Sequence, residues 1–134
     1  MEKSLIVIKP GAVREKHIGE ILSRFEQAGL VIEAIKMETL SNERVEEFYA
    51  EHKGKPFYQP LIEHMTSGPV VAVILSGDNA IQRIRDMAGA TDASKAEPGT
   101  IRRDFSGKPG PPNALHASDS PKSAEREIAF YFGK

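Results

Sequence analysis

The stretch VVAVIL, residues 70–75, is the strongest candidate for a buried strand, because six apolar residues follow one another without interruption. The turn residues SGP at 67–69 precede this run, and SGDNA at 76–80 opens the next helix. We therefore expect a central strand of a sheet, entered through a turn and followed directly by a helix.

The periodicity of the apolar residues places the other elements around this strand. A short β-branched run, SLIVIK, ends at Lys9, Pro10 and Gly11, which are expected to form a turn. The further expected strands are LVIEAIKMETL at 30–40 and NALHAS at 113–118. Apolar residues at helical spacing predict helices over 18–28, 41–52, 58–65, 80–88 and from Ser120 onward. Residues 89–112 lose this periodicity and are expected to form a long loop.

The resulting order of elements predicts the fold class. Once the extra helices are set aside, it is the βαββαβ plan of a ferredoxin-like α/β sandwich, an α+β arrangement with an antiparallel sheet. The length of 134 residues suits one compact core, and no repeat or low-complexity tract divides the chain. We expect a single domain over 1–134.

The composition excludes several classes of protein. The net charge of −1 argues against a general affinity for nucleic acid or anionic membranes. The absence of cysteine excludes disulfides, iron–sulfur clusters, thiolate zinc sites and cysteine nucleophiles. The first apolar run, of four residues, is too short for a signal peptide, and no stretch approaches the roughly 18 apolar residues of a membrane-spanning helix. A cytoplasmic protein is expected.

A histidine among small residues is the main candidate for catalysis. In NALHASDSP at 113–121, His116 has alanine, leucine and serine close to it, and a helix is expected to start at Ser120–Pro121. The unpaired N–H groups of a helix start favour an anion such as phosphate. Glu127 on that helix is placed to hold one ring nitrogen and leave the other free to attack. These residues alone leave two interpretations open, a nucleophile and a histidine satisfied within a core.

Phosphate binding needs cations from separate elements that converge. Lys9 at a strand end, Arg85 late in a helix and Arg102 in the long loop are the candidates, and Thr91 would add a hydroxyl donor. Each cation alone is also explained as surface charge, although Lys9 follows a buried strand and fits that explanation least. Neither GxxxxGK(S/T) nor GxGxxG occurs, so both Gly-rich phosphate loops are excluded.

Two aromatic residues indicate where a nucleotide base would be held. Tyr49 and Phe57 flank AEHKGKP, between two short helices that together can form a clamp. Phe57 is placed to stack on a base, with core packing as the alternative. A site that uses only Phe57 and Leu61 would contact the face of a base and tolerate many bases.

Several ordered segments resemble the nucleoside diphosphate kinase family, and together they cover almost the whole chain. The most specific is NALHASDSPKSAEREIAFYF at 113–132. The family pattern there is Asn-x-x-His-(Gly/Ala)-Ser-Asp-Ser, followed after a short gap by the Glu on the final helix. The other matching segments are IVIKP (6–10), GEILSRFEQAGL (19–30), FYAEHKGKPFY (48–58), SGPVVAVIL (67–75) and ATDASKAEPGTIRRDF (90–105).

The resemblance implies an enzyme that transfers the γ-phosphate of a nucleoside triphosphate, mainly ATP, to a nucleoside diphosphate. The implied mechanism is ping-pong, through a phosphohistidine at His116 that Glu127 orients. Asn113 is implied as a ribose partner. The implied catalytic residues are His116, Glu127, Lys9, Tyr49 and Ser118, and the implied nucleotide-binding residues are Lys9, Phe57, Leu61, Arg85, Thr91, Arg102 and Asn113.

The resemblance also implies Mg²⁺ as a cofactor, held mainly by nucleotide phosphates and water. No metal site built by the protein is expected, because His17, His52 and His64 show neither HExxH nor His-x-His spacing. Phosphoryl transfer depends mostly on positioning and charge stabilisation, which cations and a metal ion supply together. Family members are homo-oligomers, and we expect a hexamer ahead of a tetramer.

The departures from the family pattern leave the catalytic positions untouched. Gly11 stands where an acidic residue usually follows the proline, and Arg103 stands where glycine is usual. Ala93 replaces a frequent proline, and Pro112 ends a slightly longer segment, SGKPGPP, where an arginine is often found. Ala93 and that segment lie where family members make subunit contacts, so hexamer and tetramer both stay open.

Two other kinds of protein are alternatives. An RNA-recognition module on the same fold would need paired aromatic residues on its central strands, whereas these strands carry LIVI (5–8) and VVAVIL. A phosphocarrier would accept phosphate on His116 without a nucleotide clamp, and residues such as Phe57 and Asn113 would then share no purpose. We therefore expect the enzyme, with nucleotides as its partners and with no membrane and no specific nucleic acid.

Overall fold

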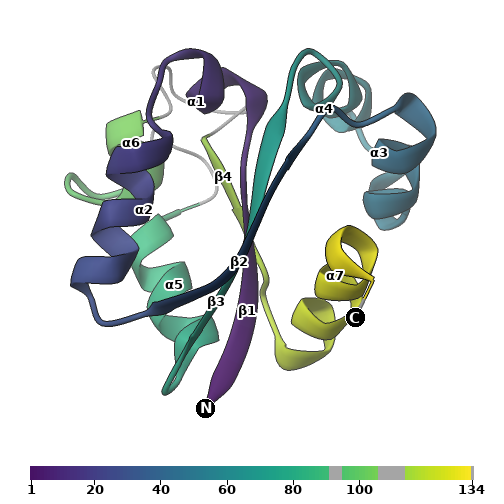
Figure 1. The fold of residues 1–134 in the computed structure, drawn as a ribbon. Helices are drawn as coiled ribbons and strands as arrows, with labels where there is room; N and C mark the ends of the chain where they lie inside the picture. Colours follow the sequence, from purple (N-terminus) through teal and green to yellow (C-terminus); the bar gives the residue numbers. More distant parts are fainter. Residues whose placement is uncertain (91–94, 106–113, 134) are drawn as a thin grey trace.

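The computed structural model describes residues 1–90, 95–105 and 114–133, and its centre is a four-stranded antiparallel sheet (Figure 1). The strands lie in the order β2-β3-β1-β4. Their bounds are Glu2–Ile8 for β1, Val31–Glu38 for β2, Val70–Gly77 for β3 and Leu115–Ala117 for β4. The run VVAVIL therefore lies in a central strand, as expected, and every residue of β3 is buried.

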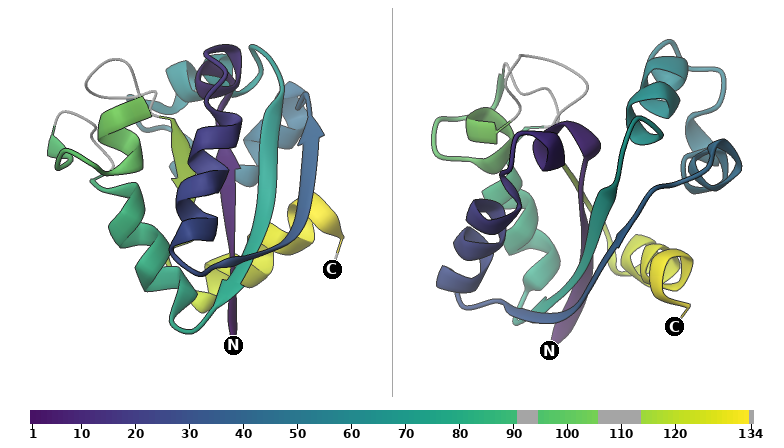
Figure 2. Two further views of the ribbon diagram at one scale, coloured as in Figure 1. Left: turned by 60° about the vertical axis from the view of Figure 1, so that its left-hand side comes forward. Right: turned by 45° about the horizontal axis from the view of Figure 1, so that its top comes forward.

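Helices cover both faces of the sheet, as Figures 1 and 2 show. One face carries α2 (Ile18–Gln27), α5 (Ala80–Ala88) and α6 (Ile101–Phe105), with α1 (Pro10–Arg14) at one end of the sheet. The other face carries α3 (Asn42–Phe48), the 3₁₀ turn η1 (Ala50–His52), α4 (Tyr58–Met65) and α7 (Pro121–Phe132). This arrangement confirms the ferredoxin-like α+β sandwich with extra helices. No helix in the described part of the chain is long and apolar enough to cross a membrane.

The sheet divides the core into two apolar clusters. Side chains alternate between the two faces along a strand, so neighbouring residues of β1 belong to different clusters. Ile6 and Ile8 pack in the cluster that contains Phe25 of α2, whereas Leu5 and Val7 pack in the cluster with the helices of the opposite face. Because β1 is buried on both faces, its last residues hold a fixed position at the end of the sheet.

Three local features differ from the sequence-based expectation. Pro10 and Gly11 begin helix α1 and not a turn, because proline lacks the N–H that the first helical position leaves unpaired. The stretch 89–112 was expected to be a loop, but α6 lies within it and buries Ile101 and Phe105, one helical turn apart. The helix expected over 41–52 is divided, since α3 ends at Phe48 and η1 follows.

Candidate active site

His116 lies in the middle of β4, opposite Val7 of β1. Shortly after the strand, Ser120 caps α7, because its side chain accepts a hydrogen bond from the Ser123 N–H at 3.0 Å. Pro121 takes the first helical position, as predicted. This tight connection turns α7 back across the sheet and brings Glu127 to the imidazole.

His116 and Glu127 are joined by a hydrogen bond of 2.9 Å between Nε2 and Oε1. The Ser118 hydroxyl donates to the same carboxylate oxygen at 2.6 Å, and the Ser118 N–H is fixed by the Leu5 carbonyl. Burial raises the pKa of the Glu127 carboxyl, but the hydrogen bonds from His116 and Ser118 outweigh it and hold that pKa below its usual range. The carboxylate is therefore ionised at neutral pH and accepts the Nε2 proton. Nδ1 is left with the lone pair.

Two aromatic rings of α3 and its C-terminal end enclose the imidazole. Phe48 meets His116 edge-on at 5.2 Å, and Tyr49 meets it edge-on at 6.2 Å between ring centroids. The Tyr49 hydroxyl is buried and has no hydrogen-bond partner among the described residues. Burial raises its pKa well above the usual value, and Tyr131 and Glu127 add to the effect. This hydroxyl keeps its proton and suits an acceptor such as a phosphate oxygen.

Three cations from separate elements come together near the end of β1. Lys9 is 7% exposed, and its backbone N–H donates to the Ala114 carbonyl before β4. Burial, with the charge of Arg102, lowers the pKa of Lys9 to about 8. Arg102 is 6% exposed, and burial together with Arg85 lowers its pKa to about 10. Buried like charges repel one another, so an anion placed among them would relieve an unfavourable arrangement.

Backbone carbonyls hold the Arg102 guanidinium in place. One NH group donates to the Gly89 carbonyl at 2.6 Å, and Nε donates to the Leu115 carbonyl next to His116 at 3.3 Å. Helix α6 carries Arg102 and is itself fixed to α2, since Arg24 forms an ion pair of 2.8 Å with Asp104. Helix α6 was not predicted from the sequence, because the residues around it have no helical periodicity. The apolar pair Ile101 and Phe105, spaced one turn apart, was the only sign of the helix.

The residues expected to hold the base lie at the surface. Phe57 precedes α4 and is 40% exposed, and Leu61 is half-buried one turn further along that helix. His52 meets the Phe57 ring edge-on at 5.3 Å, and the Lys55 ammonium lies 5.8 Å from the same ring. Exposure of this ring agrees with a stacking role more than with the core packing that was the alternative.

Two expected site residues, Thr91 and Asn113, lie outside the described residues. The remaining histidines are separate from one another. His17 packs on Phe105, His52 on Phe57, and His64 accepts from the Gly11 N–H. Over 1–90, 95–105 and 114–133, no group of three or more His, Asp or Glu side chains is arranged to hold a metal ion.

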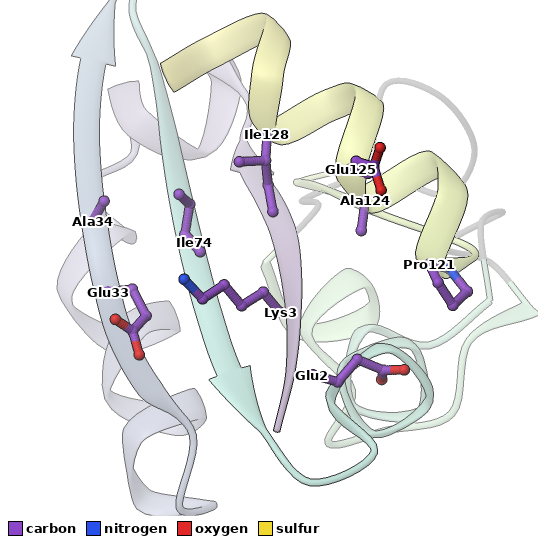
Figure 3. A pocket seen from close by; sticks show the side chains of 9 residues that line it. All are labelled: Glu2, Lys3, Glu33, Ala34, Ile74, Pro121, Ala124, Glu125 and Ile128. Carbon is purple, nitrogen blue, oxygen red and sulfur yellow. The ribbon is translucent and has the colours of Figure 1, made fainter. Parts of the chain in front are cut away.

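A depression of about 390 Å³ lies elsewhere, between α7 and the sheet (Figure 3). Ala34, Ile74 and Lys3 line it from the strands, and Glu125 and Ile128 line it from α7. None of the expected site residues that the structure describes lines it. The described candidates for catalysis therefore lie around His116 and not at this depression.

Comparisons with known proteins show which family this chain resembles in sequence and fold. The family model for nucleoside diphosphate kinase matches residues 2–134. The chain is 56% identical to a nucleoside diphosphate kinase of Staphylothermus marinus, over 98% of this chain and 92% of that protein. It is 54% identical to one from Psychromonas ingrahamii, over 98% and 91%. Among solved structures, it matches the Aquifex aeolicus nucleoside diphosphate kinase with a TM-score of 0.93 and 47% identity, over 98% and 94% of the two chains. It matches the Halobacterium salinarum enzyme in complex with CDP with a TM-score of 0.95 and 40% identity, over 99% and 88%.

Proposed function

The chain belongs to the nucleoside diphosphate kinase family, and we propose that His116 is the residue through which it moves phosphate between nucleotides. The chain is a phosphotransferase that binds nucleotides and acts as a nucleoside diphosphate kinase. The main support for this role of His116 is its 2.9 Å hydrogen bond to the buried, ionised Glu127. That bond engages Nε2 and directs the lone pair of the ring to Nδ1.

The proposed reaction has two half-reactions that mirror one another. In the first, Nδ1 attacks the γ-phosphorus of the triphosphate. A nitrogen–phosphorus bond forms while the bond to the oxygen of the β-phosphate breaks, and the nucleoside diphosphate leaves. The ring gains positive character and keeps its Nε2 proton, which Glu127 stabilises. In the second, a terminal oxygen of another nucleoside diphosphate attacks the same phosphorus; the new oxygen–phosphorus bond forms while the Nδ1–phosphorus bond breaks, and the electron pair returns to Nδ1 of neutral His116.

The cations are proposed to bind and orient the phosphates. Lys9 is assigned to the transferred phosphate, with the Tyr49 hydroxyl as a second donor, because both groups are buried at the same end of the sheet as His116. Arg102 and Arg85 are assigned to the remaining phosphates. Thr91 and Asn113 keep the roles expected from the sequence, on the diphosphate and on the ribose.

Phe57 is proposed to stack on the base, with Leu61 packing beside it. Stacking on an exposed ring contacts the face of a base and not its edges, so it supports broad acceptance of nucleotides. ATP is proposed as the main donor.

Mg²⁺ is proposed as the metal ion, held by nucleotide phosphates and water. The ammonium of Lys9, the guanidinium of Arg102 and the unpartnered hydroxyl of Tyr49 suit phosphate oxygens and not a bare divalent ion. When bound, the ion would neutralise charge that develops on the transferred phosphate.

We also propose that the chain forms a homo-oligomer of single domains spanning 1–134, a hexamer ahead of a tetramer, in the cytoplasm. The support is β2, which lies at the edge of the sheet and exposes Val31, Ile35 and Met37 to 50%, 52% and 56%. An apolar edge strand favours pairing with another chain. Light scattering of Ile35→Lys, which places a charge on that edge, should give a smaller particle than the parent protein.

The role of His116 is tested by incubation with γ-³²P-labelled ATP. The protein should acquire a label that is stable in base and lost in acid, and should pass it to free nucleoside diphosphates. His116→Ala should abolish both, while His17→Asn, which changes a distant histidine, should label like the parent. A His116→Ala protein that still labels would refute the assignment. Labelling without exchange between free nucleotides would favour a phosphocarrier.

A further inference from the structure

Helix α1 begins immediately after Lys9 and lacks a cap of its own. The residue at its N-cap position is Lys9, whose side chain makes no capping hydrogen bond and has no acceptor to offer. The first N–H groups of a helix have no partner within the helix. Here the Gly11 N–H donates to Nε2 of His64 at 3.4 Å. The imidazole of His64, on α4, therefore caps α1 by accepting a hydrogen bond from its first turn, as the side chain of an N-cap serine or aspartate does in other helices.

The fit between His64 and Gly11 depends on both residues. A Cβ added at position 11 would lie 3.0 Å from Cε1 of His64, so an alanine there would push the imidazole away by a few tenths of an ångström. The glycine leaves room for the histidine.

A second connection joins the far end of α1 to the same part of α4. Arg14 donates to the Ser67 hydroxyl at 3.0 Å, and that hydroxyl donates to the His64 carbonyl at 2.6 Å. Residue 64 thus contacts α1 through its side chain near the start and through Ser67 near the end. Helix α4 follows Phe57, so the contact links the proposed base clamp to the segment that carries Lys9.

The charge state of His64 suits this contact. Burial, with Lys9 at the end of β1 and Arg14 on α1, lowers the pKa of His64 to about 4. The ring is therefore neutral at neutral pH and keeps the lone pair that the Gly11 N–H needs. A neutral ring also adds no positive charge beside Lys9.

We propose that His64 is a positioning residue for Lys9: its Nε2 accepts from the Gly11 N–H, fixes the first turn of α1, and so holds the Lys9 ammonium in its buried place. The inference rests on the proposed function, because it takes Lys9 to contact the transferred phosphate. A loosened α1 would let the Lys9 side chain reach water, where its pKa returns towards the ordinary lysine value.

The test compares three variants in nucleotide affinity and in the single-turnover rate of His116 labelling across pH 7 to 10. His64→Phe keeps a ring of similar size without an acceptor. It should slow labelling about three- to tenfold, change nucleoside diphosphate affinity less, and move the alkaline fall in affinity to higher pH. His64→Gln offers a neutral acceptor and should restore most of both properties. Melting curves check that each protein is folded.

Gly11→Ala provides the second route, because it displaces the imidazole without removing it. Gly11→Ala should also move the alkaline fall in nucleotide affinity to higher pH. The double variant with His64→Phe should show no larger shift than His64→Phe alone. The inference is overturned if folded His64→Phe labels at the parent rate and loses nucleotide affinity at the same alkaline pH as the parent. It is also overturned if the effects of Gly11→Ala and His64→Phe on the labelling rate are additive in the double variant. Failure of the parent protein to label at all would instead overturn the proposed function.

Discussion

The phosphate end and the base end of the proposed nucleotide site are built in opposite ways. At the phosphate end, Lys9 and Arg102 are almost fully buried, and backbone carbonyls hold Arg102. At the base end, Phe57 is 40% exposed, and His52 and Lys55 contact its ring. Buried cations are held in fixed positions, but without an anion they destabilise the folded protein. An exposed ring does not destabilise the folded protein and is free to move. The groups that we propose to act on the reacting atoms are therefore held by the core, and the ring that we propose to contact a variable base lies at the surface.

The largest effect should come from removing a buried charge. Lys9→Met keeps most of the side-chain volume and should reduce phosphoryl transfer by about 10²- to 10³-fold. It should also raise the free energy of unfolding by about 1–3 kcal/mol, because burial and Arg102 already disfavour the charged Lys9 in the free protein. Labelling rates and urea unfolding measure the two quantities.

The control for Lys9→Met is Lys3→Met on β1, the strand that Lys9 follows; the Lys3 side chain is exposed. It should change neither activity nor stability appreciably. A loss of stability in Lys9→Met that matches its loss of activity would argue against the view that the phosphate end is strained until an anion binds.

The next effect concerns the negative charge of Glu127, which faces the proposed nucleophile His116. Glu127→Gln keeps the shape of the side chain but removes the negative charge that faces Nε2, so labelling of His116 should slow by about 10²-fold. Glu125→Gln, an exposed neighbour on α7, is the matched control and should behave like the parent. Rapid-quench labelling at saturating ATP separates this loss from any change in binding. A rate within twofold of the parent would show that position 127 acts through shape alone.

Alkaline pH should separate affinity from stability at the phosphate end. With its pKa lowered to about 8, Lys9 loses its charge above that pH in the free protein, and nucleotide affinity should fall about tenfold by pH 9.5. The folded state binds fewer protons than the unfolded state between this pKa and the ordinary lysine value near 10.4. The contribution of Lys9 to the free energy of unfolding therefore increases with pH in that window. Affinity and stability should move in opposite directions, and Lys9→Met should lack both trends.

The same contrast explains which parts of the molecule the sequence could predict. The strand VVAVIL and the cap Ser120–Pro121 depend on neighbours in the chain, so their patterns are visible without a structure. The pairing of His116 with Glu127 was predicted because the strand and the capped helix follow one another directly. The contact between Gly11 and His64 joins residues 53 positions apart, and no local pattern indicates it. Helix α6 was missed because five residues are too few to establish a period.

The smallest effect should arise at the base end. Phe57→Ala removes one stacking face, worth about 1 kcal/mol, and should raise the KM for nucleoside diphosphates about fivefold while kcat stays within twofold. Because the ring is exposed, the free energy of unfolding should change by less than about 0.5 kcal/mol. Steady-state kinetics with a purine and a pyrimidine diphosphate measure the effect on two bases. Phe57→Trp, which keeps a stacking face, should retain a KM close to that of the parent. A fall in kcat comparable to that of Lys9→Met would mean that the clamp also positions the phosphates, and the division between a fixed phosphate end and a tolerant base end would then be wrong.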